Sequence, residues 1–171
     1  MRTGWLIAAI IMAVPAAAEP GEPAPPADFA RRVLAEHNAE RGRVGVPRLV
    51  WNGRLAHGAQ AWADRLARDG TVRHAPREAR GGAGENLWFG TAGLFPTEAM
   101  IGAFVSQKRL YRPGPFPAVS STGRWQDVGH YTQVVWRTTR EVGCGLARGS
   151  GHDVLVCRYW PAGNWVGEAV Y

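Results

Sequence analysis

The sequence has little cysteine, almost no lysine and no long apolar run after its first 14 residues. Two cysteines in 171 residues exclude a disulfide-dense scaffold, in which cross-links take the place of a hydrophobic core. No later segment reaches the roughly 20 apolar residues that a membrane-spanning helix needs. Internal repeats are absent as well. These absences leave a single globular domain of ordinary size.

Basic residues outnumber acidic ones, and the net charge is +6 with the histidines neutral. Lys108 is the sole lysine, and the arginines are spread along the chain among the acids. Nucleic-acid-binding domains usually gather their basic side chains into one patch or stripe. We therefore expect no nucleic-acid partner, and we attribute the charge to solubility and to weak attraction toward anionic envelope surfaces.

The N-terminus has the pattern of a secretory signal peptide. Arg2 supplies a positive start, residues 4–14 are almost wholly apolar, and Ala16 and Ala18 offer the small side chains of a cleavage site. An apolar run of about 11 residues is too short to span a bilayer, so a retained anchor is the weaker alternative.

Cleavage after Ala18 divides the chain into three parts. We predict a signal peptide at residues 1–18, a proline-rich leader at 19–27 and one folded domain at 28–171. The mature protein is then expected to be secreted or periplasmic, with no stable membrane insertion and as a monomer.

Helical patterns come first in the predicted domain. Asp28 is a candidate N-cap for a helix that runs to about Arg41, and Asn52 is a candidate N-cap for a second helix that ends at Gly70. A third helix is predicted to start at Pro96 or Thr97. Prolines exclude regular structure from residue 113 to about 121.

Strand patterns follow toward the C-terminus. Residues 131–136 form a β-rich run, and 142–147 and 154–159 are predicted strands around a turn at 149–153. That hairpin would place Cys144 opposite Cys157. Export favours a disulfide between them, worth about 3 kcal/mol in the chain-entropy model, and two buried free thiols are the alternative. Helices first and a hairpin last predict an α+β domain.

Two long segments carry a specific resemblance to a known family. Residues 129–136 (GHYTQVVW) and 154–165 (VLVCRYWPAGNW) resemble the two signatures of the CAP/SCP superfamily, which comprises cysteine-rich secretory proteins, antigen 5 and pathogenesis-related class 1 proteins. Weaker pieces occur in the family's order: His37-Asn38 with Arg41, residues 55–63, and residues 84–87. The resemblance covers the chain from about Asp28 to its end.

The resemblance implies a three-layer α-β-α sandwich with a central antiparallel sheet. The short signal peptide and the two-cysteine domain indicate the bacterial, single-domain type.

A cleft lined by two histidines and two glutamates is also implied by the resemblance. His130 matches the histidine of the first signature, Glu85 the glutamate of a Gly-Glu-Asn motif, and His74 the histidine upstream of that motif. The second glutamate position, near the end of the third helix, holds Gln107 in this chain. The expected cleft residues are therefore His74, Glu85, Gln107 and His130.

The two histidines of this cleft are candidate metal ligands. Neutral imidazoles can each offer one ring nitrogen to a divalent cation such as Zn²⁺, and a nearby carboxylate can fix the tautomer. His74 and His130 would be those ligands. Because Gln107 removes one negative charge, we expect zinc to bind only weakly. Asp127, close to His130 in sequence, is a candidate replacement for the missing carboxylate.

The remaining histidines are assigned no chemistry: His37 to packing and hydrogen bonding, His57 to an exposed helix face and His152 to a turn. Other motif residues are assigned structural roles, with positive φ or local hydrogen bonding expected for the asparagines and the glycine. They are Asn86, Tyr131, Trp136, Tyr159, Gly163 and Asn164.

Three classes of function follow. The first is a non-catalytic extracellular binding protein for a small ligand, a divalent cation or a lipid as the resemblance implies. The second is a secreted hydrolase with His130 as base, Glu85 as its orienting carboxylate and a serine nucleophile, although no Gly-x-Ser-x-Gly elbow occurs. Its candidate nucleophiles are Ser106, Ser120 and Ser121. The third is an envelope scaffold whose cleft is vestigial.

Overall fold

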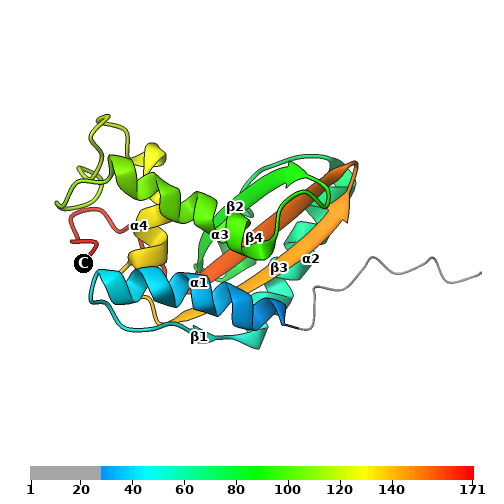
Figure 1. Ribbon diagram of the computed structural model, residues 1–171, viewed down its shortest axis with the longest axis horizontal. Helices are drawn as coiled ribbons and strands as arrows, with labels where there is room; N and C mark the ends of the chain where they lie inside the picture. The colour runs from blue at the N-terminus through cyan, green and yellow to red at the C-terminus, as the bar shows by residue number, and fades with distance from the viewer. Residues whose placement is uncertain (1–27) are drawn as a thin grey trace, which may run out of the picture.

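The computed structural model describes residues 28–171, and the predicted signal peptide and leader lie outside the described residues. Figure 1 shows how the chain runs through its helices and strands. In order, these are α1 (Phe29–Arg43), β1 (Val50–Trp51), α2 (Gly53–Asp69), β2 (Gly84–Thr91), α3 (Thr97–Ser106), α4 (Gly129–Val135), β3 (Glu141–Gly149) and β4 (His152–Trp160).

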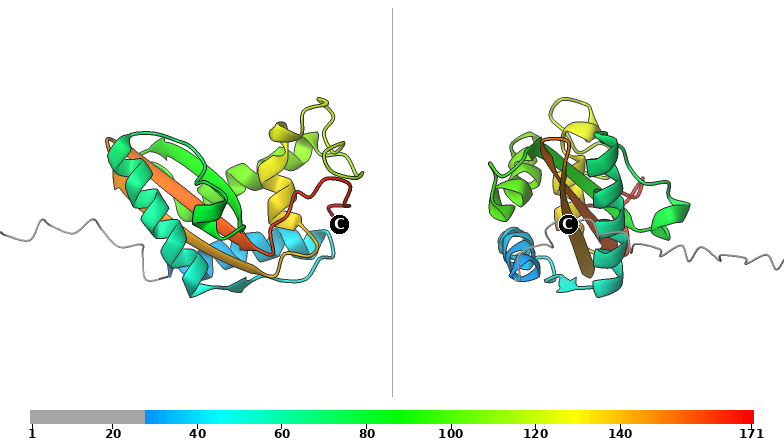
Figure 2. Two further views of the ribbon diagram at one scale, coloured as in Figure 1. Left: turned by 180° about the vertical axis from the view of Figure 1, so that it is seen from behind. Right: turned by 90° about the vertical axis from the view of Figure 1, so that its right-hand side faces the viewer.

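The four strands form one sheet in the order β1-β3-β4-β2. The β3–β4 and β4–β2 pairs are antiparallel, and only the two-residue strand β1 pairs in parallel with β3. Helix α2 covers one face, while α1 and α3 cover the other, as the right-hand view of Figure 2 shows. The predicted α-β-α sandwich is confirmed, with one short parallel pair added to its antiparallel sheet.

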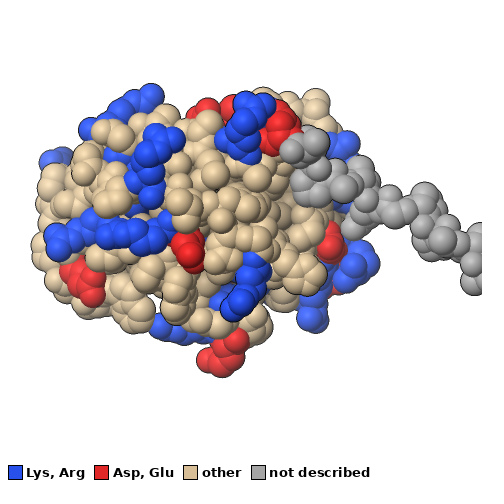
Figure 3. Space-filling view, turned by 90° about the horizontal axis from the view of Figure 1, so that it is seen from below, with Lys and Arg blue, Asp and Glu red and all other residues tan. Residues whose placement is uncertain are grey.

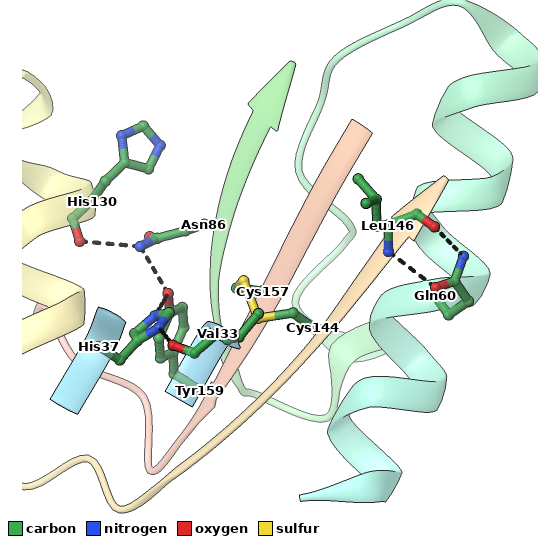
Figure 4. Close-up of a disulfide and its surroundings, with 9 residues drawn as sticks. All are labelled: Val33, His37, Gln60, Asn86, His130, Cys144, Leu146, Cys157 and Tyr159. Atoms are coloured by element: carbon green, nitrogen blue, oxygen red, sulfur yellow. Dashed lines mark hydrogen bonds between the residues drawn. A yellow bond between two sulfur atoms is a disulfide. The ribbon is translucent and has the colours of Figure 1, made fainter. Parts of the chain in front are cut away.

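Helix α2 packs unusually close to β3 because glycines replace side chains at the contact. A Cβ atom on Gly143 would lie 2.2 Å from the backbone nitrogen of Ala56, and one on Gly145 would lie 2.3 Å from Cα of Gln60. The Gln60 side chain donates to the carbonyl oxygen of Leu146 and accepts from its N–H, both at 3.0 Å (Figure 4). It thereby satisfies the backbone of β3 where β1 no longer pairs with it.

Helix α2 also carries the predicted N-cap. The Asn52 side-chain oxygen accepts from the N–H groups of Arg54 and Leu55, and Gly70 ends the helix at φ 61°. For α1, the predicted N-cap position is correct, but the predicted capping hydrogen bond is not formed. Asp28 does precede the helix, but its side chain makes no capping hydrogen bond and accepts from Arg31 instead.

The prediction of a β-rich run over 131–136 is wrong, since residues 131–135 form most of α4 and Trp136 is its C-cap. Every residue from Tyr131 to Trp136 is buried, so no polar face marks a helical period. A short, fully buried segment rich in valine gives the same pattern as a buried strand. Tertiary contacts therefore decide its structure.

The hairpin of β3 and β4 agrees with its prediction and is tighter than expected. Ser150 and Gly151 form the connection with φ values of 52° and 78°, the left-handed pair that a two-residue hairpin turn requires. Cys144 and Cys157 are register partners and are joined by a disulfide, with their Cα atoms 4.1 Å apart.

Removal of this disulfide is expected to weaken the domain without unfolding it. The Cys144→Ala/Cys157→Ala variant should lose about 2–3 kcal/mol of unfolding free energy, because the cross-link closes a short loop in the unfolded chain. Urea titrations of both proteins at one pH would measure the loss. A loss below about 1 kcal/mol would contradict the entropic account.

In residues 28–171, no helix combines the length and apolarity needed to cross a bilayer. Acidic side chains lie among the basic ones on the face drawn in Figure 3. Several basic residues pair with neighbouring acids, as Arg73 does with Asp69 and Arg148 with Asp153. The mixing of charge seen along the sequence therefore extends to this surface.

Candidate functional site

A cleft of about 710 Å³ opens where the start of β2 meets α4 and the C-terminal segment. This volume is in the range of small-molecule sites. His74, Glu85 and His130 line it, while Gln107 lies behind His130 and does not. Its other walls are formed by aromatic rings, two arginines and glycine-rich backbone, including Phe116, Trp125, Trp165, Arg77, Arg80, Gly84 and Gly163.

Glu85 lies at the start of β2 directly opposite Arg158 of β4. Its side chain is fully buried. One carboxylate oxygen accepts from the backbone N–H of Ala75 at 2.9 Å, and the other accepts from Nε of Arg158 at 3.3 Å. A Cβ on Gly58 would lie 2.6 Å from Nη1 of Arg158, so this glycine gives the guanidinium its space. The buried negative charge is thus paired within the protein.

His74 projects from the loop after α2 and stays half exposed. Its Nδ1 lies 2.9 Å from Oε1 of Glu85. Because the Glu85 carboxylate can only accept, Nδ1 carries a proton and donates it, which leaves a lone pair on Nε2 of the neutral ring. Glu85 therefore orients His74, whereas the sequence interpretation assigned it to orient His130.

His130 lies in the first turn of α4, with its ring stacked on Phe104 at 5.0 Å between centroids. Burial, and to a smaller extent the neighbouring His74, lowers its pKa to about 4. The ring is therefore uncharged near neutral pH. Its Nδ1 lies 2.8 Å from Nε2 of Gln107, and Gln107 Oε1 accepts from the backbone N–H groups of His130 and Tyr131.

A hydrogen-bond chain connects the cleft to α1 (Figure 4). The Asn86 amide donates to the His130 carbonyl oxygen at 3.1 Å and to the Tyr159 hydroxyl at 3.2 Å. The Tyr159 hydroxyl lies 2.9 Å from Nε2 of His37, whose Nδ1 donates to the Val33 carbonyl oxygen at 2.8 Å. Since neighbouring strand residues point to opposite faces, Asn86 positions α4 while Glu85 positions His74.

A buried arginine fixes the other end of α4. Arg41 of α1 has no exposed surface, and its guanidinium donates to the carbonyl oxygens of Val134, Trp136 and Thr139 at 2.9–3.0 Å and to that of Pro47 at 2.6 Å. Burial lowers its pKa to about 10, so the group stays charged at neutral pH. The helix that carries His130 is thereby held at its C-terminus by a cation.

The residues assigned to structural roles play four different parts. Asn86 lies in a regular strand and acts through its hydrogen bonds, so the expectation of backbone shaping is wrong for it. Asn164 has φ 60°, as expected. Gly163 does not have the positive φ expected of it and is needed for space instead, because a Cβ there would lie 2.6 Å from Cγ of Trp136. Tyr131 and Trp136 are core residues.

None of the candidate serine nucleophiles lies in the cleft. Ser106 bonds back to the Ala103 carbonyl oxygen within its helix, and Ser120 bonds to Thr122. Within residues 28–171, no serine is among the residues that line the cleft. Asp127 accepts from Thr122 rather than from His130. The predicted combination of a serine, His130 and Glu85 is therefore not assembled.

Two site residues were missed from the sequence. Arg158, which neutralises Glu85, lies in the second signature and is nearly buried in β4. A lone arginine in an apolar strand was the available signal, because a buried cation requires a partner. Arg77 lies with its guanidinium carbon 5.0 Å from the Trp165 ring centroid at the cleft wall, and no sequence signal marks this contact.

The residues present fit a zinc ion poorly. Both oxygens of Glu85 are engaged by donors, so only two imidazoles remain as candidate ligands, whereas catalytic zinc sites use three protein ligands. Within residues 28–171, no three His, Cys, Asp or Glu side chains are grouped to hold a metal ion. Weak zinc binding by His74 and His130 remains a prediction.

Comparison with known families identifies the chain's class. Residues 34–159 match the CAP domain of the cysteine-rich secretory protein family. The chain therefore belongs to the cysteine-rich secretory protein family.

Relatives of known sequence and structure agree with this assignment. The chain is 40% identical to pathogenesis-related leaf protein 4 of Solanum lycopersicum over 139 aligned residues. This alignment covers 81% of this chain and 80% of the relative. It is 35% identical over 145 residues to pathogenesis-related protein 1 of Arabidopsis thaliana, covering 84% and 83%. BmVAL-1 shares its fold at a TM-score of 0.67 and 28% identity, covering 89% and 85%. NaASP2, whose structure was solved with Zn²⁺, has a TM-score of 0.70 at 22% identity, covering 90% and 88%.

Proposed function

We propose that this protein is an exported, non-catalytic binding protein that holds a small ligand in the cleft around His74, Glu85 and His130. The observation that carries the proposal is the cleft itself: two imidazoles are held in fixed orientations beside a cavity of about 710 Å³ that no candidate nucleophile enters. Family membership and the N-terminal export pattern support a role outside the cytoplasm.

The interior of the cleft supports binding rather than hydrolysis. Glu85 is paired with Arg158 and with the Ala75 N–H, so its charge is used to hold the loop of His74 in place. Aromatic rings and polar groups together line the cavity, which is the usual composition of ligand pockets. His74 and His130 supply the polar contacts of the proposed site.

Native mass spectrometry of the mature protein, purified from its own host, tests the proposal. We expect the wild type to carry a non-covalent ligand and the His74→Ala/His130→Ala variant to lose it. A His57→Ala/His152→Ala variant removes two histidines outside the cleft and should retain the ligand. Far-ultraviolet circular dichroism would verify that all three proteins are folded.

Each remaining outcome has a defined meaning. A bare polypeptide mass in all three proteins would contradict the binding role and favour the envelope scaffold. A ligand retained by every variant would place binding elsewhere, as expected for a lipid in a separate groove.

A further inference from the structure

Gln107 lies between α3 and α4 and carries an amide. The CAP/SCP resemblance places a glutamate carboxylate at this position. Oε1 of Gln107 lies 3.0 Å from the His130 backbone nitrogen and 3.3 Å from that of Tyr131. Val128 precedes α4 and provides no side-chain cap. Gln107 therefore caps α4 from another part of the chain.

This capping fixes which way the amide faces. Both backbone groups are donors, so the Gln107 atom next to them must be the oxygen. Its Nε2 then lies on the His130 side, 2.8 Å from the ring Nδ1. An amide nitrogen can only donate, so Nδ1 of His130 must accept. The single proton of the neutral ring is consequently on Nε2.

The opposite arrangement holds at His74, where Glu85 accepts from Nδ1. The two histidines of the cleft thus differ in tautomer: His74 leaves an unprotonated Nε2, and His130 carries a proton on its Nε2. A protonated ring nitrogen has no lone pair to give a metal ion. At Nε2, His74 is therefore a hydrogen-bond acceptor and His130 a hydrogen-bond donor, and the two rings do not form a pair of metal ligands.

We propose that Gln107 locks His130 in the Nε2–H tautomer, so that the cleft selects an uncharged polar ligand over a divalent cation. The ligand would place a donor at Nε2 of His74 and an acceptor at Nε2–H of His130, as an alcohol or a secondary amide does. The choice of ligand class rests on the proposed function, whereas the tautomer of His130 does not.

A carboxylate at position 107 would reverse the tautomer. In Gln107→Glu, one oxygen can still accept from the N–H groups that begin α4, and the other would accept from Nδ1–H of His130. The lone pair would then move to Nε2, and His130 could serve as a metal ligand with a carboxylate behind it.

Long-range ¹⁵N–¹H NMR of the imidazole rings tests the tautomer in the ligand-free wild type, without any substitution. We expect His130 to carry its proton on Nε2 and His74 on Nδ1, and His130 to change to Nδ1–H in Gln107→Glu. A proton on Nδ1 of His130 in the wild type would overturn the proposal.

Calorimetric titration with zinc alone supplies a second readout. Gln107→Glu should bind zinc about 10–100-fold more tightly than the wild type, the usual effect of a carboxylate behind a ligating histidine, and a further His130→Ala substitution should abolish the gain. Gln126→Glu is the charge-matched control, because Gln126 lines the cleft and forms no hydrogen bond with His130 among the described residues.

Equal zinc affinity in the wild type and Gln107→Glu, or an equal gain in Gln126→Glu, would show that tautomer does not control the site. Both readouts use protein without the natural ligand. If mass spectrometry found only the bare polypeptide, the proposed binding role would fail, but the NMR and zinc titration results could still be interpreted.

Discussion

The Arg41→Met variant is expected to lose about 3–5 kcal/mol of unfolding free energy. The Arg41 guanidinium is fully buried and donates to four backbone carbonyl oxygens. Methionine fills much of the volume and supplies no donor, so the carbonyl oxygens of Val134, Trp136 and Thr139 would be left without their partner in the core. An unsatisfied buried acceptor costs about 1–3 kcal/mol, and partial relaxation keeps the total below the simple sum.

Arg41→Lys tests whether geometry or charge matters. A lysine ammonium is a compact group that cannot direct donors to acceptors on several sides, so we expect it to recover only part of the loss. Urea unfolding of both variants would measure it, with the exposed Arg48→Met as the matched control. A loss below about 1 kcal/mol in Arg41→Met would show that α4 is not held through this residue.

A drop in stability between neutral and mildly acidic pH is the second large effect expected. His37 is fully buried, and this burial lowers its pKa to about 4, with Arg41 adding a smaller effect in the same direction. In the unfolded chain the pKa returns to its ordinary 6.5. Between these values the unfolded state binds a proton that the folded state does not. The contribution of neutral His37 to the unfolding free energy is therefore fully present above pH 6.5 and is lost as the pH falls toward 4.

The contribution of His37 can be isolated by difference. Between about pH 7 and pH 4.5, the wild type should lose about 2–3 kcal/mol more than His37→Gln, whose side chain does not titrate. His130 also has a lowered pKa, but it is present in both proteins and its effect cancels. His57→Gln removes an exposed histidine of α2 and should leave the pH dependence of the wild type unchanged.

Parallel stability curves for wild type and His37→Gln would show that His37 contributes no linkage. Proton NMR of the wild-type ring gives an independent check. Its resonances should titrate well below pH 6 in the folded protein.

Local sequence signals were sufficient for α2 and for the β3–β4 hairpin, where the structure depends on neighbouring residues. Asn52 and Gly70 mark the two ends of α2, because a cap acts on groups within a few residues of itself. Cys144 and Cys157 flank a two-residue turn, so the hairpin brings them together without help from other elements. The two signature segments likewise indicated the fold, and the first of them contains His130 of the cleft.

Tertiary structure decided what depends on distant partners. Residues 131–136 are buried on every side, so only Arg41, which binds the carbonyl oxygens of Val134 and Trp136, and the core around them distinguish a helix from a strand. The sequence alone therefore could not specify α4.

Through the family resemblance, the sequence predicted His74, Glu85 and His130, which line the cleft, and Gln107, which lies behind His130. It also identified Gln107 as the departure that matters, and there it predicted only the loss of one charge. The tertiary structure decided the pairing, in which Glu85 serves His74 and Gln107 serves both His130 and the start of α4. A ring tautomer depends on the direction of one hydrogen bond, and that direction exists only when α3 and α4 pack together.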